Sequence, residues 1–291
     1  MLSLYLHIPF CAHVCSYCSF PIAAKQGEDI IQRYLQQLHA EIDHYGTLYP
    51  QADIKSIYFG GGTPNLIGAE ELIKLITHLE QVFNCEQVAE LSLEFNPYPQ
   101  DEILSLVKKL NTVYRKRPRV RYSFGIQSFD NGVLAQAGRP YTFPGMVEFL
   151  RALQPLKQEN NVFNFDFIAF GKFNQTKKGN PQLRTPSALS FFEDVVHAHF
   201  ADSFSLYTLE FSEHQARRRQ QPKDEASGRA KKSDLISKGC CGTEEEIYEE
   251  FDILKNILLS AGYKRYEISN FALISKSSIH NRVYREMEEY L

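Results

Sequence analysis

The chain alternates between two patterns of apolar residues. Short runs of roughly 4–8 apolar or β-branched residues are typical of buried strands, and the longer segments between them repeat apolar residues every three or four positions, as amphipathic helices do. Six runs predict β-strands at residues 2–8, 54–59, 90–95, 121–126, 162–168 and 203–209. Strands that alternate with helices indicate βαβ units, in which neighbouring strands run parallel.

The helical pattern is clearest in the first two connections. Apolar residues share one face of each helix: Ile31, Tyr34, Leu35, Leu38 and Ile42 in the first, and Leu72, Leu75, Ile76, Leu79 and Phe83 in the second. Six parallel strands with crossover helices predict an α/β fold, either a partial (βα)6 TIM-like barrel or an open, curved sheet. In both architectures functional residues collect at the carboxyl ends of the strands.

Composition limits the possible functions. The chain has 291 residues, a net charge of −3 and 43% hydrophobic residues, which suit an ordinary enzyme-sized globular protein. A charge this close to neutral gives no reason to expect a nucleic-acid partner. No apolar run approaches the roughly 20 residues of a transmembrane helix, and the N-terminus does not resemble a signal peptide. We therefore expect a cytoplasmic protein with reduced thiols.

Three cysteines close together are the first sign of chemistry. Cys11, Cys15 and Cys18 form a Cys-x3-Cys-x2-Cys triplet directly after the first predicted strand. Thiolates select zinc, copper(I) or iron–sulfur clusters, and a [4Fe–4S] cluster held by only three of them leaves one iron open to another ligand. The alternatives are a zinc site completed by His7 or His13, and a disulfide, which a reducing compartment disfavours. The remaining cysteines offer no obvious fourth ligand: Cys85, Cys240 and Cys241.

Glycine-rich and polar motifs follow several of the predicted strands. Gly60-Gly61-Gly62-Thr63-Pro64 follows the second strand, Glu94 lies at the end of the third, Gln127 follows the fourth and Asp166 lies within the fifth. Glycines let a ligand approach the backbone closely, because they have no Cβ. Each motif alone has an ordinary alternative, a tight turn for the glycines or a helix cap for each polar residue. Their convergence at one end of the sheet, together with the cysteines, predicts a shared binding site.

These motifs together resemble those of the radical S-adenosylmethionine superfamily, beginning with the cysteine triplet and Gly-Gly-Gly-Thr-Pro. Their order is similar to that of the oxygen-independent coproporphyrinogen III oxidase-like group. The further motifs are Leu4-Tyr5-Leu6-His7-Ile8-Pro9-Phe10-Cys11, Glu94-Phe95-Asn96-Pro97, Phe124-Gly125-Ile126-Gln127-Ser128-Phe129, Gly138-Arg139, Asn164-Phe165-Asp166 and Tyr266-Glu267-Ile268-Ser269-Asn270-Phe271. The resemblance covers nearly the whole chain. It implies a partial barrel of the radical S-adenosylmethionine type with a short α+β C-terminal extension.

The resemblance also implies a role for individual residues. Cys11, Cys15 and Cys18 would hold a [4Fe–4S] cluster, whose open iron would bind the amino and carboxylate groups of S-adenosylmethionine. The reduced cluster would then cleave this cofactor to a 5′-deoxyadenosyl radical. Further cofactor contacts are implied for Tyr5, Gly61, Gly62, Thr63, Glu94, Gln127, Arg139 and Asp166. Carboxylates suit its hydroxyl or ammonium groups and arginine suits its carboxylate, while the alternative for Tyr5 is an aromatic residue buried in the barrel.

One departure from the oxidases bears on function. Their triplet extends to Cys-x3-Cys-x2-Cys-x-Cys, whereas Ser19-Phe20 follows Cys18 here. The departure favours the haem-chaperone branch of the group, which implies binding of haem or another tetrapyrrole and its delivery to an acceptor protein. Two alternatives stay open. One is an oxidase or other radical enzyme, and the other is a degenerate, truncated relative that keeps only cluster binding.

The chain divides into three expected parts. These are a radical S-adenosylmethionine core at residues 1–214, a basic and flexible loop at 215–242, and a truncated C-terminal region at 243–291. Thr243 and the glutamates after it predict a capping box at the start of a helix that ends at Gly262.

A second resemblance lies near the C-terminus. His280-Asn281-Arg282-Val283-Tyr284-Arg285 resembles a His-Asn-x-x-Tyr-Trp motif of the group that is implicated in haem handling, with Arg285 in the Trp position. A neutral histidine is a suitable axial ligand to haem iron, so His280 is the candidate haem ligand. The alternative is a surface histidine in a frayed tail.

Overall fold

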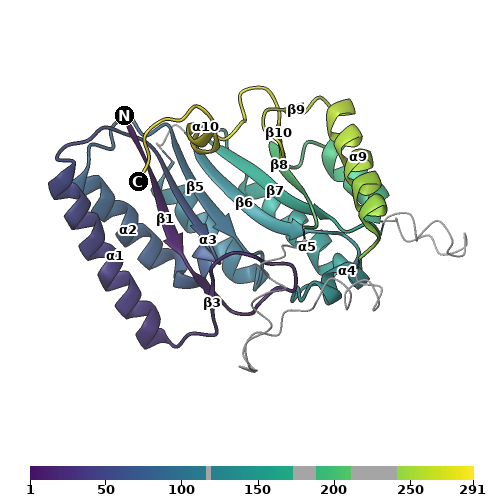
Figure 1. The fold of residues 1–291 in the computed structure, drawn as a ribbon, viewed down its shortest axis with the longest axis horizontal. Helices are drawn as coiled ribbons and strands as arrows, with labels where there is room; N and C mark the ends of the chain where they lie inside the picture. The colour runs from purple at the N-terminus through teal and green to yellow at the C-terminus, as the bar shows by residue number, and fades with distance from the viewer. Residues whose placement is uncertain (116–118, 173–187, 211–240) are drawn as a thin grey trace, which may run out of the picture.

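One mostly parallel sheet organises the chain. The computed structural model describes residues 1–115, 119–172, 188–210 and 241–291. Within them an eight-stranded sheet has the order β1-β4-β5-β6-β7-β8-β10-β9 (Figure 1), and its first six strands are parallel. These six are β1 (Leu2–Ile8), β4 (Ile54–Gly61), β5 (Glu90–Phe95), β6 (Val120–Gln127), β7 (Asn161–Ala169) and β8 (Ser203–Thr208). Every predicted strand is present to within two residues at each end, and the α/β fold is confirmed.

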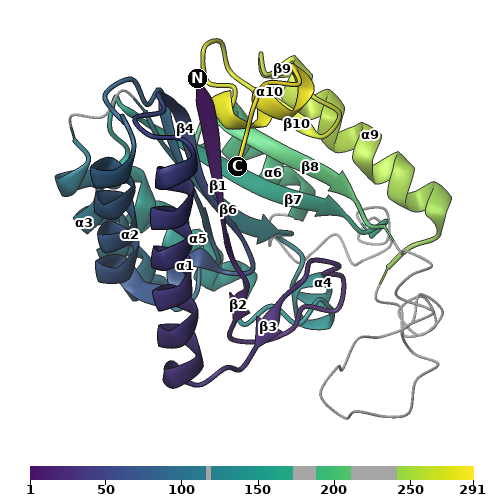
Figure 2. The ribbon, with the colours of Figure 1, turned by 60° about the vertical axis from the view of Figure 1, so that its left-hand side comes forward.

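Amphipathic helices cover one face of this sheet (Figures 1 and 2). They are α1 (Glu28–Leu48), α2 (Gly68–Val82), α3 (Gln100–Val113), α5 (Phe143–Leu153), α6 (Ala188–His197) and α9 (Glu244–Ser260). The periodic residues predicted for the first helix, Ile31, Leu35, Leu38 and Ile42, are its buried residues. Three shorter helices lie in connections: η1 (Pro64–Ile67), α4 (Asn131–Gln136) and η2 (Gln154–Leu156). No helix within the described ranges has the length and apolar character needed to cross a membrane.

The two faces of the sheet differ in chemistry. Successive side chains of a strand point to opposite faces. On the helix side they form an apolar core, as Ile57 and Phe59 of β4 do. Ser56 and Tyr58 of the same strand point the other way and make polar contacts with neighbouring strands and with the C-terminal region. The face opposite the six long helices is therefore the polar face of the sheet, and it carries the predicted site residues that lie within the strands.

The C-terminal region reaches both edges of the sheet. β10 (Asn270–Ala272) pairs antiparallel with β8, and β9 (Lys264–Arg265) pairs with β10. At the opposite edge, residues 289–291 lie along β1, where the amides of Ser3 and Tyr5 donate to the carbonyls of Glu289 and Leu291 at 3.1 and 2.7 Å. Between the two edges, α10 (Ile279–Arg285) lies against the polar face of the sheet and contacts β4 and β5 (Figure 2).

Two local predictions for this region are confirmed. Thr243 and Glu246 form a capping box at the start of α9, and Gly262, with a φ of +91°, follows the end of that helix. The predicted basic loop at 215–242 lies outside the described residues except for Cys241 and Gly242.

Candidate cofactor site

The cysteine loop is tied to the glycine motif by backbone hydrogen bonds. Cys11 ends the short strand β2 (Phe10–Cys11), which pairs with β3 (Ala23–Ala24). The amide of Gly62 donates to the carbonyl of Ile8 and that of Thr63 donates to the carbonyl of Phe10, both at 2.8 Å. The Thr63 hydroxyl lies 3.3 Å from the Cys11 sulfur. The two sequence motifs therefore form one unit at the carboxyl ends of β1 and β4.

The glycines are required by this close approach. A Cβ on Gly62 would lie 2.7 Å from the carbonyl oxygen of Phe10, and one on Gly61 would lie 2.5 Å from the His7 ring. Gly61 also has a φ of +112°, which side chains with a Cβ rarely adopt. An ordinary tight turn does not account for these contacts, because the glycines pack against the loop that carries the cysteines.

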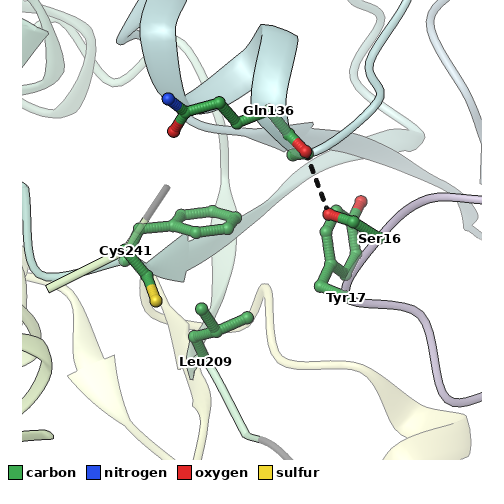
Figure 3. A pocket seen from close by; sticks show the side chains of 7 residues that line it. Ser16, Tyr17, Gln136, Leu209 and Cys241 are labelled. Atoms are coloured by element: carbon green, nitrogen blue, oxygen red, sulfur yellow. Dashed lines mark hydrogen bonds between the residues drawn. The ribbon is translucent and has the colours of Figure 1, made fainter. Parts of the chain in front are cut away.

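A small pocket shows how the middle of the cysteine loop is held (Figure 3). The Ser16 hydroxyl donates to the carbonyl of Gln136 at 3.1 Å, and the Ser16 amide donates to that of Ala137 at 3.2 Å. Both carbonyls belong to the C-terminal end of α4, so this helix positions the loop. Tyr17 and the buried Cys241 line the same pocket.

Arg139 connects the cysteine loop to the ends of β5 and β6. It donates five hydrogen bonds, to Cys15 Sγ (3.3 Å), Tyr17 OH (3.3 Å), Asn96 Oδ1 (2.7 Å), the Gly125 carbonyl (2.8 Å) and Tyr141 OH (2.8 Å). Burial raises the pKa of the Cys15 thiol, but a hydrogen bond from His13 and the charge of Arg139 outweigh burial and lower this pKa to about 7. A lower pKa favours the thiolate, which is the form that binds metal.

Glu94 faces the glycine motif from the end of β5. One of its oxygens accepts from Tyr58 OH at 2.6 Å and the other from the amide of Gly61 at 3.1 Å. Burial raises the pKa of this carboxyl, and the hydrogen bond from Tyr58 opposes the shift. Glu94 caps no helix among the described elements, so the helix-cap alternative is wrong for this residue.

Asp166 lies deeper on the same face and is also held by strand side chains. It accepts from the Ser123 hydroxyl at 3.0 Å and from the Asn164 amide group at 2.7 Å. Burial raises its pKa, and the charge of Arg121 opposes this. Its position inside β7 rules out a helix cap here as well.

Gln127 occupies an irregularity at the end of β6. Its φ is +67°, and the pairing of β6 with β7 shifts register between Gly125 and Gln127. A Cβ on Gly125 would lie 2.7 Å from Gln127 Nε2, so the glycine leaves room for this amide group. The bulge turns Gln127 away from the regular strand alternation, as bulges near functional sites commonly do.

Tyr5 belongs to the site and not to the apolar core. It is partly exposed, stacks on Tyr58 with ring centroids 5.8 Å apart, and its hydroxyl lies 3.1 Å from His7 Nδ1. Burial and then the nearby Glu94 raise its pKa. Tyr5 is therefore only partly buried and lies beside Tyr58, outside the apolar core.

The donor set suits an iron–sulfur cluster, since three thiols lie on one short loop. Among the described residues no three or more Cys, His, Asp or Glu side chains are gathered closely enough to hold one ion. His7 uses both ring nitrogens, toward Tyr5 OH and the carbonyl of Pro21. A cubane binds each thiolate through a different iron, so its ligands lie farther apart than those of one ion. Cys11, Cys15 and Cys18 form no disulfide in the structure.

His280 is held inside the protein by two hydrogen bonds. It is fully buried in α10, against the polar face of the sheet, so the alternative of a surface histidine in a frayed tail is wrong. Its Nδ1 lies 2.9 Å from Ser56 Oγ and its Nε2 lies 2.9 Å from Tyr284 OH. Burial lowers its pKa to about 4, which keeps the ring neutral. Both nitrogens are thus engaged within the protein.

Sequence reasoning missed two residues that the site uses. Asn96 accepts from Arg139, and Tyr141 donates to the Gly125 carbonyl at 2.6 Å beside the same arginine. Asn96 follows Glu94 in the motif already quoted, so its place at a strand end was a usable signal. Nothing in the local sequence marks Tyr141.

Comparison with known proteins agrees with this geometry. The sequence profile of the radical SAM superfamily matches residues 5–174, more than half of the chain. The chain belongs to the radical SAM superfamily. It is 27% identical to the heme chaperone HemW of Lactococcus lactis, over 99% of this chain and 66% of the relative, and 29% identical to HemW of Bacillus subtilis, over 100% and 68%. The chain thus spans about two thirds of the length of these relatives.

A solved structure confirms the fold of this radical SAM protein. Coproporphyrinogen III oxidase (HemN) from Escherichia coli, described as a radical SAM enzyme, superposes with a TM-score of 0.68. The match covers 98% of this chain and 58% of that one, at 20% identity. At this identity the likeness establishes the fold, and the function has to be argued from the site.

Proposed function

We propose that this protein is a HemW-like haem chaperone. It holds a [4Fe–4S] cluster through Cys11, Cys15 and Cys18, binds S-adenosylmethionine beside it, and delivers haem to an acceptor protein in the cytoplasm. The observation that carries the proposal is the convergence of the cysteine loop, the glycine motif and Arg139 at one end of the sheet. Similarity to HemW over the whole length of the chain supports it.

The site residues divide the binding between them. Gly61 and Gly62 let the glycine motif pack against the cysteine loop, because no Cβ intervenes, and so place Gly61, Gly62 and Thr63 beside the proposed cofactor. Glu94 is placed to accept hydrogen bonds from an ammonium or hydroxyl group, and Gln127 offers an amide group at the end of β6. When bound, the cluster supplies an electron to S-adenosylmethionine.

The cluster is tested by anaerobic reconstitution with iron and sulfide. Electron paramagnetic resonance of the reduced protein is recorded with and without S-adenosylmethionine. We expect a [4Fe–4S]⁺ signal that changes when the cofactor is added, because one iron has no protein ligand. A Cys85→Ser variant is the matched control, since that buried thiol lies outside the cysteine loop. Zinc in place of iron would contradict the proposal.

The haem function is tested separately by titration with haem. A chaperone binds haem stoichiometrically, seen in the Soret band, and does not consume coproporphyrinogen. The second candidate is an oxygen-independent coproporphyrinogen oxidase, because the order of the motifs along the chain resembles that of the oxidase-like group. That enzyme would release 5′-deoxyadenosine at a rate that rises with coproporphyrinogen. Ser19-Phe20, in place of an extended cysteine motif, is the sequence feature against it.

A further inference from the structure

The hydrogen bonds of His280 fix which of its nitrogens carries the proton. Ser56 Oγ donates its one proton to Ser3 Oγ at 2.8 Å, so it accepts from His280 Nδ1–H. Nε2 then carries the lone pair and accepts from Tyr284 OH. A haem iron would need that lone pair, which Tyr284 already uses.

The His280 ring lies against a residue of the cofactor site. Its centroid is 5.0 Å from that of Tyr58, whose hydroxyl donates to Glu94 at 2.6 Å. The second oxygen of Glu94 accepts from the amide of Gly61. Three contacts therefore connect α10 to the glycine motif, through one aromatic ring and one carboxylate.

The helix that carries His280 is itself firmly held. Buried Glu90 accepts from the Ser278 hydroxyl at 2.8 Å and from the amides of Ile279 and His280 at 3.1 and 3.3 Å. After α10, Lys55 pairs with Glu288 at 2.5 Å before the chain joins β1. Burial and then the nearby Tyr290 and Glu94 raise the pKa of Tyr284 to about 12. Tyr284 of α10 therefore also interacts electrostatically with the carboxylate of Glu94.

We propose that His280 is a positioning residue for the S-adenosylmethionine site, acting through Tyr58 on Glu94, and is not an axial ligand to haem. The inference rests on the proposed function, because Glu94 is assigned to the cofactor there. The His280 ring limits the rotation of Tyr58, and the Tyr58 hydroxyl fixes the carboxylate oxygen that faces away from Gly61. The C-terminal region thereby sets the affinity of a site that the first 170 residues build.

The test measures S-adenosylmethionine affinity by calorimetry on anaerobic, cluster-loaded protein. His280→Asn keeps a donor for Ser56 but removes the ring from Tyr58, and we expect affinity to fall about three- to tenfold, the worth of one hydrogen bond. Tyr58→Phe should give a similar loss. The double variant should bind no more weakly than Tyr58→Phe alone, because both changes act on the same contact.

Two controls separate positioning from folding and from haem ligation. Ser278→Ala removes one of the hydrogen bonds to Glu90 but leaves the His280 ring beside Tyr58, so it should lower cofactor affinity less than His280→Asn does. Haem titration of His280→Asn should give an unchanged Soret band and stoichiometry. If His280→Asn does not fold, His280→Phe replaces it: this variant keeps a ring against Tyr58, so cofactor affinity should stay near that of the wild type, and a loss as large as that of Tyr58→Phe would overturn the inference.

Three results would overturn the inference. They are additive losses in the double variant, an equal loss in Ser278→Ala, and lost haem binding with unchanged cofactor affinity in His280→Asn. The last would make His280 the haem ligand. If the wild-type protein itself binds no S-adenosylmethionine, the proposed function is overturned. This failure is distinct from failure of the inference, which shows only when the variants are compared with a wild type that does bind the cofactor.

Discussion

Gly62→Ala tests whether the cysteine loop and the glycine motif form one unit. The added methyl group would lie 2.7 Å from the Phe10 carbonyl oxygen and 2.8 Å from the carbonyl of Pro9. These are backbone atoms, which cannot rotate away as a side chain can. The loop would have to move, and the two 2.8 Å hydrogen bonds from Gly62 and Thr63 would lengthen with it.

The cost can be estimated from the contacts. Overpacking in a rigid site costs about 1–3 kcal/mol, and strained backbone hydrogen bonds favour the upper end, about 3 kcal/mol. Gly68→Ala is the matched control, because its φ of +81° is unfavourable for alanine but nothing lies within 4 Å of the new Cβ. Backbone strain alone should cost about 1 kcal/mol there.

The assay is urea unfolding of the reduced, metal-free protein. Circular dichroism is the suitable probe, because the chain has no tryptophan. We expect the midpoint of Gly62→Ala to fall about three times as far as that of Gly68→Ala. Iron and sulfide per chain after reconstitution should fall only in Gly62→Ala. Equal midpoints and full cluster content in both variants would refute the argument that close packing shapes this site.

Other predictions use single hydrogen bonds and one titration. Tyr114→Phe should leave the free energy of unfolding within about 0.5 kcal/mol of the wild type, because its buried hydroxyl has no hydrogen-bond partner among the described residues. Tyr122→Phe should destabilise by about 1–2 kcal/mol, because it removes the donor to Asn111 Oδ1; equal midpoints for the two variants would contradict this. Glu90→Gln should increase hydrogen–deuterium exchange at residues 279–291, because the carboxylate that caps α10 is lost; protection equal to the wild type would show that α10 is held by other contacts. The pKa of His280 is about 4 in the folded protein and 6.5 in the unfolded chain, so the neutral His280 ring contributes fully to stability above pH 6.5. This contribution, about 3 kcal/mol, should be lost as the pH falls towards 4, and the difference in midpoint between wild type and His280→Asn should shrink accordingly.

The strands and the cofactor motifs could be predicted because their signals are local. A buried parallel strand such as Glu90–Phe95 is a continuous run with few alternatives, and it matches the observed strand residue for residue. The cysteine triplet has a spacing that few sites share. Residues placed after strand ends were predicted to converge, because parallel strands end at one edge of the sheet, and Glu94 and Gly61 do meet there.

The remainder could not be predicted because it depends on distant partners. The hydrogen bond of Arg139 to Cys15 joins residues 124 positions apart. Likewise, the motif around His280 does not show that Nδ1 of this ring contacts Ser56, which lies 224 positions away. A short motif shows which side chain is present, and only the fold shows what that side chain contacts.

The pairing of residues 289–291 with β1 has a consequence for biosynthesis. Ser3 and Tyr290 pair across nearly the whole chain. At about 5–20 residues per second, β1 would wait on the order of 15–60 s on the ribosome before its outer partner is made. During that time β1 is an exposed sheet edge, the type of surface that invites pairing with another chain. A nascent chain that stalls before residue 289 would therefore be prone to aggregate through its first strand.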